Sequence, residues 1–428
     1  MLERFRALST SYPIYGRLII RGVYMALFKA LEIGNWRQFH KIDIDLSKQI
    51  TILTGSNGTG KTSLLNILTQ HFGWNLSFVS TPRRVSRRTR AIWSDVYEDI
   101  VLYEDDPDNG RVNIGRIDYD TGQKCDLFTD KLVTSNYSLK YSGLQAVSGL
   151  YIPSHRPQAI HSPVQSIPTN PISSQQQYQE YQNLMIQAFG SQNVRNPGTV
   201  QKQSIIALAV FGEGNDSVLP NPEYRRTFLD LQRVLSIILP RQLEFKRLEI
   251  RSGDVVLVTG TGDFSLDAMS GGVNALFGIA WQLTMFKSEN PIFTIVIDEP
   301  ENHLHPSMQR LLLPNLAEAF PNCRIVVATH SPFIITSFPE ASVYGLMYNE
   351  NKRVVSCRLE ASDLSGTPNQ VLRDVLNVDS NLPAWVAARI QQILSDPSLG
   401  DDPKVRGENV MLELARLGLA DAIVDFEA

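Results

Sequence analysis

The chain has 428 residues, of which 43% are hydrophobic and 20% charged, a balance that is ordinary for a globular protein with a sizeable core. This length predicts two or three domains. The formal net charge of −4 argues against a protein that binds nucleic acid over its whole surface. The sequence has no long uncharged apolar run, and its three cysteines show no metal-binding spacing. We therefore expect a reduced, cytoplasmic protein without a membrane span.

Residues 1–24 are predicted to be an N-terminal extension. The stretch after Tyr12 is fairly apolar, but basic residues interrupt it, and a signal peptide would need an uninterrupted apolar segment. Met25 offers an alternative start, because the residues from Phe28 onward already have the pattern of a strand. Whether the extension is native or needed stays open.

Residues 25–155 are predicted to form a first lobe around a glycine-rich loop. The short β-branched run 49–54 predicts a strand, and residues 63–72 predict a helix. Between them the sequence fits the phosphate-loop pattern G-x-x-x-x-G-K-[ST], known as Walker A, in the strand–loop–helix context that the pattern requires. The residues of this loop are Gly55, Ser56, Asn57, Gly58, Thr59, Gly60, Lys61, Thr62 and Ser63.

The residue types of this loop predict binding of a nucleoside triphosphate. Its glycines let the backbone turn N–H groups toward phosphate, and the helix that follows adds unpaired N–H groups and the positive end of its dipole. Lys61 would reach the β- and γ-phosphates, and the Thr62 hydroxyl would be a ligand of Mg²⁺.

Five arginines that follow the loop form the strongest charge cluster of the sequence. Two interpretations stay open: a solvated surface paired with acidic residues, or a contact with the phosphate backbone of DNA or RNA. The cluster consists of Arg83, Arg84, Arg87, Arg88 and Arg90.

The middle of the chain is predicted to contain an antiparallel layer and then an insertion. Turn signals at 108–110 and 119–122 favour antiparallel strands between residues 96 and 150. Residues 156–243, rich in Pro, Ser, Gln and Asn at their start, are predicted to be a flexible or helical insertion, in which 223–239 has helical spacing of apolar residues.

Residues 244–345 are predicted to form a second lobe that completes the phosphate site. Ser270, Gly271 and Gly272 open a helix; such an element can bind an anion but is also a common helix cap. The buried strand 292–297 leads into Asp298, which suits Mg²⁺, and Glu299, which suits the group that orients or deprotonates the attacking water. The strand 324–329 delivers His330, where a sensor of the γ-phosphate is expected.

In this order, the phosphate loop, the Ser-Gly-Gly element, the Asp-Glu pair and the histidine resemble the ATP-binding-cassette (ABC) ATPases. The segment 298–306 is similar to the soluble branch, the RecF-like and overcoming-lysogenization-defect-like ATPases, which includes ATPase subunits of bacterial anti-phage systems. The resemblance implies an α/β fold: a P-loop ABC-ATPase head with a mixed sheet, an antiparallel layer and a RecA-like core, a helical insertion and a short C-terminal helical region. It also implies ATP and Mg²⁺ as cofactors.

The same resemblance assigns roles to single residues. Ser270, Gly271 and Gly272 would bind the γ-phosphate of ATP held by a second copy, so that two nucleotides lie in a head-to-tail dimer. His330 matches the switch histidine of the family. Further assignments are Trp36 and Arg37 near the adenine or the α-phosphate, and His155 or Gln158 in the place of the Q-loop residue.

Two departures favour the soluble branch over the motor of a transporter. The signature 269–274 lacks the glutamine that is typical of transporters, and His305 stands where many cassettes carry the D-loop aspartate. The residues after His330 offer no Asp-x-Asp constellation of a Toprim nuclease, so we expect an ATPase without its own nuclease. Residues 346–428 are predicted to be a C-terminal helical region that either packs on its own domain or docks a partner.

The resemblance thus implies an ABC-type ATPase that hydrolyses ATP at its dimer interface, slowly as an isolated subunit. It would gate or activate a partner effector, a nuclease or toxin encoded nearby, in prokaryotic anti-phage defence. The alternative is a RecF-like repair or recombination ATPase that loads on nucleic acid. The expected partners are a second copy, in a dimer or higher oligomer, and the effector; nucleic acid stays open, and no membrane partner is expected.

Overall fold

The centre of the fold is one mixed β-sheet. A computed structural model describes residues 19–20, 23–83, 92–96, 110–156, 163–168, 172–190, 195–364, 370–371, 384–396, 398 and 403–417. Its largest sheet has eleven strands in the order β12-β10-β9-β3-β4-β20-β19-β5-β18-β17-β13, which confirms the predicted α/β class. These strands are β3 (Phe28–Gly34), β4 (Phe39–Asp45), β5 (Ile50–Thr54), β9 (Arg111–Tyr119), β10 (Lys124–Asp130), β12 (Lys140–Ser142), β13 (Gly149–Ile152), β17 (Thr294–Asp298), β18 (Arg324–Ala328), β19 (Ser342–Tyr348) and β20 (Val354–Leu359).

One half of the sheet is parallel. The strands β13, β17, β18, β5 and β19 pair in parallel, each with the next. β5 and β17 are buried along their whole length, as apolar, β-branched strands are when both faces of a sheet are covered. Because parallel strands end at the same edge, the residues that follow β5, β17 and β18 come together there.

The other half of the sheet contains the predicted antiparallel layer. β4, β3, β9, β10 and β12 pair antiparallel in that order. Along β10, buried Cys125 and Leu127 alternate with more exposed neighbours, the pattern of strands with one solvated face. β20 joins the two halves, because it pairs antiparallel with β19 and parallel with β4.

This topology crosses the domain boundaries that we predict from the sequence. The boundary at residue 345 falls inside β19, and the sheet continues through β20, so the segment after residue 345 begins with strand rather than helix. β13, from the predicted first lobe, pairs with β17 from the predicted second lobe. The two predicted lobes therefore share one sheet, because strands far apart in sequence bury their apolar faces together.

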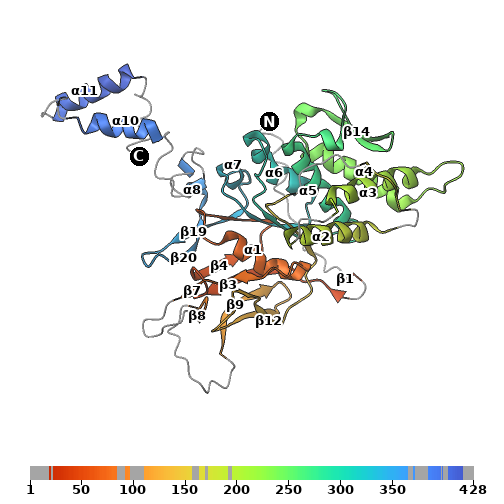
Figure 1. The fold of residues 1–428 in the computed structure, drawn as a ribbon, viewed down its shortest axis with the longest axis horizontal. Coiled ribbons are helices and arrows are strands. Elements are labelled where there is room, and N and C mark those ends of the chain that lie inside the picture. The colour runs from red at the N-terminus through yellow and green to blue at the C-terminus, as the bar shows by residue number, and fades with distance from the viewer. Residues whose placement is uncertain are drawn as a thin grey trace.

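Helices cover the parallel half of the sheet and fill the predicted insertion. Figure 1 shows α2, α3, α4 and α5 grouped on one side of the body, away from β9 and β12. The helices are α1 (Lys61–Thr69), α2 (Ser174–Gly190), α3 (Pro197–Glu213), α4 (Pro222–Ile238), α5 (Gly271–Lys287), α6 (Pro306–Ala319), α7 (Pro332–Ile335), α8 (Ala361–Leu364), α10 (Ala384–Leu394) and α11 (Pro403–Arg416). Short strands are β1 (Ile19–Ile20), β2 (Val23–Tyr24), β6 (Phe78–Val79), β7 (Pro82–Arg83), β8 (Ile92–Trp93), β11 (Asn136–Tyr137), β14 (Phe245–Arg251), β15 (Asp254–Thr259) and β16 (Phe264–Ser265).

The start of two insertion helices follows directly from local sequence. Asn196 and Asn221 are the N-cap residues of α3 and α4, and each side chain accepts a hydrogen bond from the first turn. A proline follows each of them at the first helical position, where its missing N–H costs no hydrogen bond. These Asn-Pro pairs therefore set where both helices begin.

A buried ion cluster ties the insertion to the segment before α5. Lys202 of α3 is 2% exposed, and its Nζ lies 2.9 Å from Asp254 and 2.7 Å from Asp267. The two carboxylates raise the pKa of Lys202 against the opposing effect of burial. Lys202 is therefore held charged between α3, β15 and the turn that leads to Ser270.

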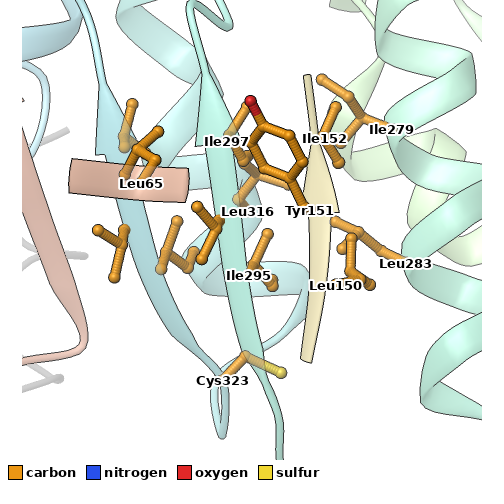
Figure 2. Packing of buried hydrophobic residues seen from close by; sticks show 14 of the residues in the cluster. Leu65, Leu150, Tyr151, Ile152, Ile279, Leu283, Ile295, Ile297, Leu316 and Cys323 are labelled. Atoms are coloured by element: carbon orange, nitrogen blue, oxygen red, sulfur yellow. The ribbon is translucent and has the colours of Figure 1, made fainter. Parts of the chain in front are cut away.

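The main core lies between the parallel strands and these helices. Figure 2 shows Ile279 and Leu283 of α5 next to Leu150 and Ile152 of β13, with Ile297 of β17 beside them. All five side chains are buried. α5 is apolar on nearly all sides, as expected for a helix enclosed by a sheet and further helices.

The two last described helices have a core of their own. α10 and α11 pack on each other through Val386, Ile390, Ile393, Val410 and Leu414, which form a hydrophobic cluster separate from the main one. Among the described residues, no helix has the length and the apolar character to cross a membrane.

Gly149→Ala should destabilise the fold. A methyl group at Gly149 would overlap the Phe72 ring and lie 2.7 Å from the carbonyl oxygen of Thr294. We expect a loss of about 1–3 kcal/mol in the free energy of unfolding, measured by chemical denaturation. Gly34→Ala is the matched control in the same sheet, because its methyl group would have only an ordinary contact at 3.9 Å. Equal stability of both variants would contradict the tight packing at Gly149.

Candidate nucleotide-binding site

The loop between β5 and α1 has the backbone of a phosphate cradle. Gly55, Gly58 and Gly60 have φ angles of 143°, 83° and 92°, values that L-residues with side chains rarely adopt. A Cβ on Gly60 would collide with Gln38 and Phe39. Only glycine fits there, and the loop turns into α1, a nine-residue helix whose first residue is Lys61.

Lys61 is buried, and no carboxylate of the described residues forms an ion pair with it. Its Nζ donates to the carbonyl oxygens of Gly55 at 2.9 Å and Ser56 at 3.1 Å. Burial lowers the pKa of Lys61 to about 8, and the negative charges of Asp298, Glu299 and Glu301 only partly oppose this effect. An anionic ligand in the loop would compensate the buried ammonium group.

Thr62 and Asp298 meet at the position that a divalent cation would occupy. The Thr62 hydroxyl donates to Asp298 Oδ2 at 2.9 Å. Asp298 is 2% exposed, and its Oδ1 is buried without a hydrogen-bond partner among the described residues. Burial raises the pKa of Asp298 to about 6. A hard cation bound to phosphate needs oxygen ligands of this kind, so the pair fits Mg²⁺ that arrives with a nucleotide.

Glu299 is held in an unusual backbone conformation beside Asp298. Its φ is 45°, which is costly for a residue other than glycine. Asn302 fixes it: the Asn302 Nδ2 donates to Glu299 Oε2 at 3.1 Å and to the carbonyl oxygen of Ser154 at 3.4 Å. Asn302 thus orients the carboxylate, and Ser154 of the loop that follows β13 helps to hold Asn302.

His330 lies opposite Glu299. Its Nε2 is 3.8 Å from Glu299 Oε1, and its backbone N–H donates to Glu301 Oε1 at 2.7 Å. Burial, followed by the charge of Lys61, lowers the pKa of His330. The imidazole is therefore neutral at pH 7, and it can donate or accept a hydrogen bond at a phosphate oxygen.

Three neighbours of this site are missed by sequence reasoning: Asn302, Glu301 and Arg156. Arg156 Nη2 reaches the carbonyl oxygen of Glu299 at 3.5 Å, while its Nε and Nη1 are buried without a hydrogen-bond partner among the described residues. The proximity of Glu301 and Asn302 to Glu299 in sequence could have indicated them. Arg156 follows β13, and only the pairing of β13 with β17 brings it there.

The Ser-Gly-Gly element faces solvent in the single chain. Ser270 is the N-cap residue of α5, but its side chain makes no capping hydrogen bond. Ser270 and Gly271 are exposed. Within the part of the chain that is described, no hydrogen bond joins Ser270 to the phosphate loop. Gly272 packs tightly, since a Cβ there would lie 2.8 Å from the carbonyl oxygen of His303.

The remaining predicted site residues either lie away from the phosphate loop or are not among the described residues. Trp36 is fully buried and donates to Tyr137 Oη at 3.0 Å; contrary to expectation, its ring therefore has no free face for an adenine, because it packs in the core. Arg37 donates to the carbonyl oxygen of Val79. His155 is exposed beside Ser154. Gln158, Arg84, Arg87, Arg88 and Arg90 lie outside the described residues, and of Arg83 only the backbone, in β7, is described.

His305, in the place of the D-loop aspartate, has a structural role here. It is the N-cap residue of α6, and its side chain accepts a hydrogen bond from the backbone N–H of Ser307. Pro306 follows at the first helical position. The residue therefore stabilises the helix start.

Comparison with known proteins identifies two family models. Residues 30–114 match a model described as "AAA domain", and residues 184–336 match one described as "AAA domain, putative AbiEii toxin, Type IV TA system". These ranges contain the phosphate loop, the Ser-Gly-Gly element, Asp298, Glu299 and His330. The matches confirm the family resemblance that we predict from the sequence.

Parts of the chain are similar in sequence to parts of other proteins. Septu protein PtuA from Bacillus thuringiensis is 24% identical over 35% of this chain and 42% of that protein. The Retron Vc95 probable ATPase from Vibrio cholerae serotype O1 biovar El Tor is 30% identical over 20% of this chain and 18% of that protein. The chain thus aligns with less than half of either relative. Among solved structures, the SMC head domain from Thermotoga maritima matches with a TM-score of 0.37 and 15% identity, over 78% of this chain and 99% of that chain.

Asp298→Asn should stabilise the nucleotide-free protein at neutral pH. Because burial raises the pKa of Asp298 from 3.8 to about 6, the folded state binds a proton more tightly than the unfolded state. Stability is therefore lost as the pH rises from about 4 to about 6, by about 3 kcal/mol for this shift of about two pKa units. The amide carries no charge and avoids this loss.

Denaturant titrations between pH 4 and pH 8 would check this expectation. The gain of Asp298→Asn over the parent should be largest above pH 6 and shrink toward pH 4. Asp126→Asn, at an exposed position of β10, is the control and should change stability by less than about 0.5 kcal/mol. A gain that does not depend on pH would contradict the buried charge as its cause.

Proposed function

Because the chain is an AAA/ABC-type ATPase by family, we propose that two copies bind ATP with Mg²⁺ between them and hydrolyse it at their interface. Each copy supplies the phosphate loop, Asp298, Glu299 and His330 to one nucleotide. The Ser-Gly-Gly element of the other copy closes the site over the γ-phosphate. The nucleotides lie in a head-to-tail dimer with two such sites.

The observation that carries this proposal is a half-site in which two charged groups that would bind the ligand, Lys61 and Asp298, are already buried. Burial lowers the pKa of Lys61 and raises the pKa of Asp298, and the attraction between the two charges only partly offsets the effect of burial. Triphosphate with Mg²⁺ would supply the anion that Lys61 lacks and the cation that Asp298 Oδ1 lacks. Ser270 is exposed, and its side chain makes no capping hydrogen bond to α5. An anion at the N-terminus of this seventeen-residue helix is favourable. This supports the Ser-Gly-Gly element of a partner copy as the second half of the nucleotide site.

In the proposed hydrolysis, each side chain of the site accepts a proton, orients a reacting group or stabilises charge. The water that attacks the γ-phosphorus gives its proton to a carboxylate oxygen of Glu299, while Asn302 holds the other oxygen. Neutral His330 donates a hydrogen bond to the γ-phosphate, and Lys61 stabilises the charge that develops on the oxygen between the β- and γ-phosphates. Bound Mg²⁺, held by Thr62 and Asp298, would neutralise phosphate charge and orient the terminal group.

We place this ATPase in prokaryotic anti-phage defence, as the subunit that gates an effector. Similarity to a Septu protein and to a retron ATPase supports this setting over the RecF-like alternative. The proposed effector is a nuclease or toxin encoded nearby, released or activated by ATP-dependent closing of the dimer. The helix pair α10–α11, which has a core of its own and exposes Trp385 and Leu412, offers a candidate surface for that partner.

Glu299→Gln should bind ATP without turnover and accumulate as a dimer. The amide cannot accept the proton of the attacking water, but phosphate binding does not depend on it. Size-exclusion chromatography with light scattering, with and without ATP and Mg²⁺, would measure the dimer, and phosphate release would measure turnover. Lys61→Ala is the control and should neither bind nucleotide nor dimerise in response to it. Turnover by Glu299→Gln at the parental rate would remove Glu299 from its role.

Mixing two inactive variants should restore activity if the site is shared. Lys61→Ala lacks a working phosphate loop, and Ser270→Arg blocks the element that closes the partner's site. Each alone should be inactive, whereas a mixed dimer has one intact site. Random pairing predicts on the order of a quarter of the parental turnover. No recovery in the mixture, with both variants folded by circular dichroism, would contradict a site built by two copies.

A further inference from the structure

The positions of the site residues indicate in which direction the base of a bound nucleotide extends from the phosphate loop. Asp298, Glu299 and His330, which mark the γ-phosphate end, follow β17 and β18. In the sheet, β5 lies between β18 and β19. A nucleotide with its γ-phosphate at the carboxylates therefore directs its base toward β19.

The loop is in direct contact with β19 on that side. A Cβ on Gly55 would collide with the carbonyl oxygen of Leu346, so the start of the loop lies against the end of that strand. On the same side, Gln38 Nε2 donates to the carbonyl oxygen of Gly58 at 3.4 Å. Residues at the carboxyl end of β19 are thus neighbours of the loop although they are almost three hundred residues away in the sequence.

Trp36, the aromatic residue that was expected near the adenine, cannot stack on the base. Trp36 is fully buried between Phe39 and Phe78, with ring centroids 5.9 and 5.0 Å from its own. Arg37 lies over the Trp36 and Phe78 rings and is 3.9 Å from Asp95. Both side chains are engaged within the antiparallel layer.

Tyr348, the last residue of β19, places a half-exposed aromatic ring at the required position. It is 50% exposed, although most of β19 is buried. Its Oη lies 3.7 Å from the position that a Cβ on Gly58 would take. A large, half-exposed ring at the mouth of a phosphate loop is a surface on which a base can stack.

We propose that Tyr348 is the stacking platform for the base of the bound nucleoside triphosphate. This inference rests on the proposed function and adds the residue that makes the site prefer a nucleotide over a bare polyphosphate. Stacking on a ring tolerates different bases because each has a π-face. The platform therefore predicts binding of nucleoside triphosphates as a class, without selection of a single base.

Two probes separate base binding from phosphate binding: the non-hydrolysable analogue adenylyl imidodiphosphate and inorganic tripolyphosphate, each with Mg²⁺. Calorimetric titration of the full chain should show that Tyr348→Ala weakens binding of the analogue by about 5- to 100-fold. Its affinity for tripolyphosphate should stay that of the parent. Tyr348→Phe keeps the ring and should bind both probes like the parent.

Steady-state kinetics gives a second readout. Because stacking acts equally in the ground state and the transition state, Tyr348→Ala should raise KM for ATP and leave kcat unchanged. Trp385→Ala, at an exposed aromatic residue of α10, is the control and should change neither. Thermal melts would establish that both alanine variants are folded.

The proposal is overturned if Tyr348→Ala binds the analogue like the parent, or if it loses analogue and tripolyphosphate to the same extent. Loss of both probes by Tyr348→Ala would assign Tyr348 to the shape of the loop. A parent chain that binds tripolyphosphate but gains nothing from the nucleoside contradicts the platform alone. A parent chain that binds neither probe contradicts the proposed function and the platform together.

Discussion

The site depends on one pair of buried, oppositely charged groups that do not neutralise each other. Lys61 bonds to carbonyl oxygens of its own loop, and Asp298 keeps one oxygen without a partner among the described residues. Burial lowers one pKa and raises the other. Burial of these charges has a free-energy cost, which binding of a triphosphate with Mg²⁺ would offset. An arrangement selected for stability alone would pair these charges or replace them by apolar groups.

The order of the strands in the sheet places the residues of the site in a row along one edge. β18 separates β5 from β17, so that the histidine after β18 lies between the phosphate loop and the Asp-Glu pair. From the loop after β13, Arg156 contacts the carbonyl oxygen of Glu299, and Ser154 accepts a hydrogen bond from Asn302, which holds the Glu299 carboxylate. β19 bounds the loop on the opposite side. The carboxyl ends of these strands therefore carry different groups in order, from the carboxylate proposed to activate water at one side to the proposed base platform at the other.

Sequence patterns predicted the parts of this site that are contiguous. The phosphate loop, the strand before Asp298 and the strand before His330 each carry their signal within a few residues. The Glu299–Asn302 contact was within reach for the same reason. Thr62 and Asp298 are 236 positions apart, but their residue types within the two motifs already suggested a shared Mg²⁺. Arg156 and Tyr348 were not, because their positions depend on pairing of β13 with β17 and of β19 with β5. The predicted boundary at residue 345 failed similarly, since a hairpin that completes a distant sheet carries no local mark of where it pairs.

The ion pairs of Lys202 connect the insertion to the segment that precedes Ser270. One ammonium group joins α3 to Asp267, three residues before the helix cap at Ser270. A second polar contact lies nearby, because Ser204 of α3 accepts a hydrogen bond from Trp281 of α5, the helix that Ser270 precedes. The outer helices of the insertion therefore bear directly on the position of the element that is proposed to close the partner's site.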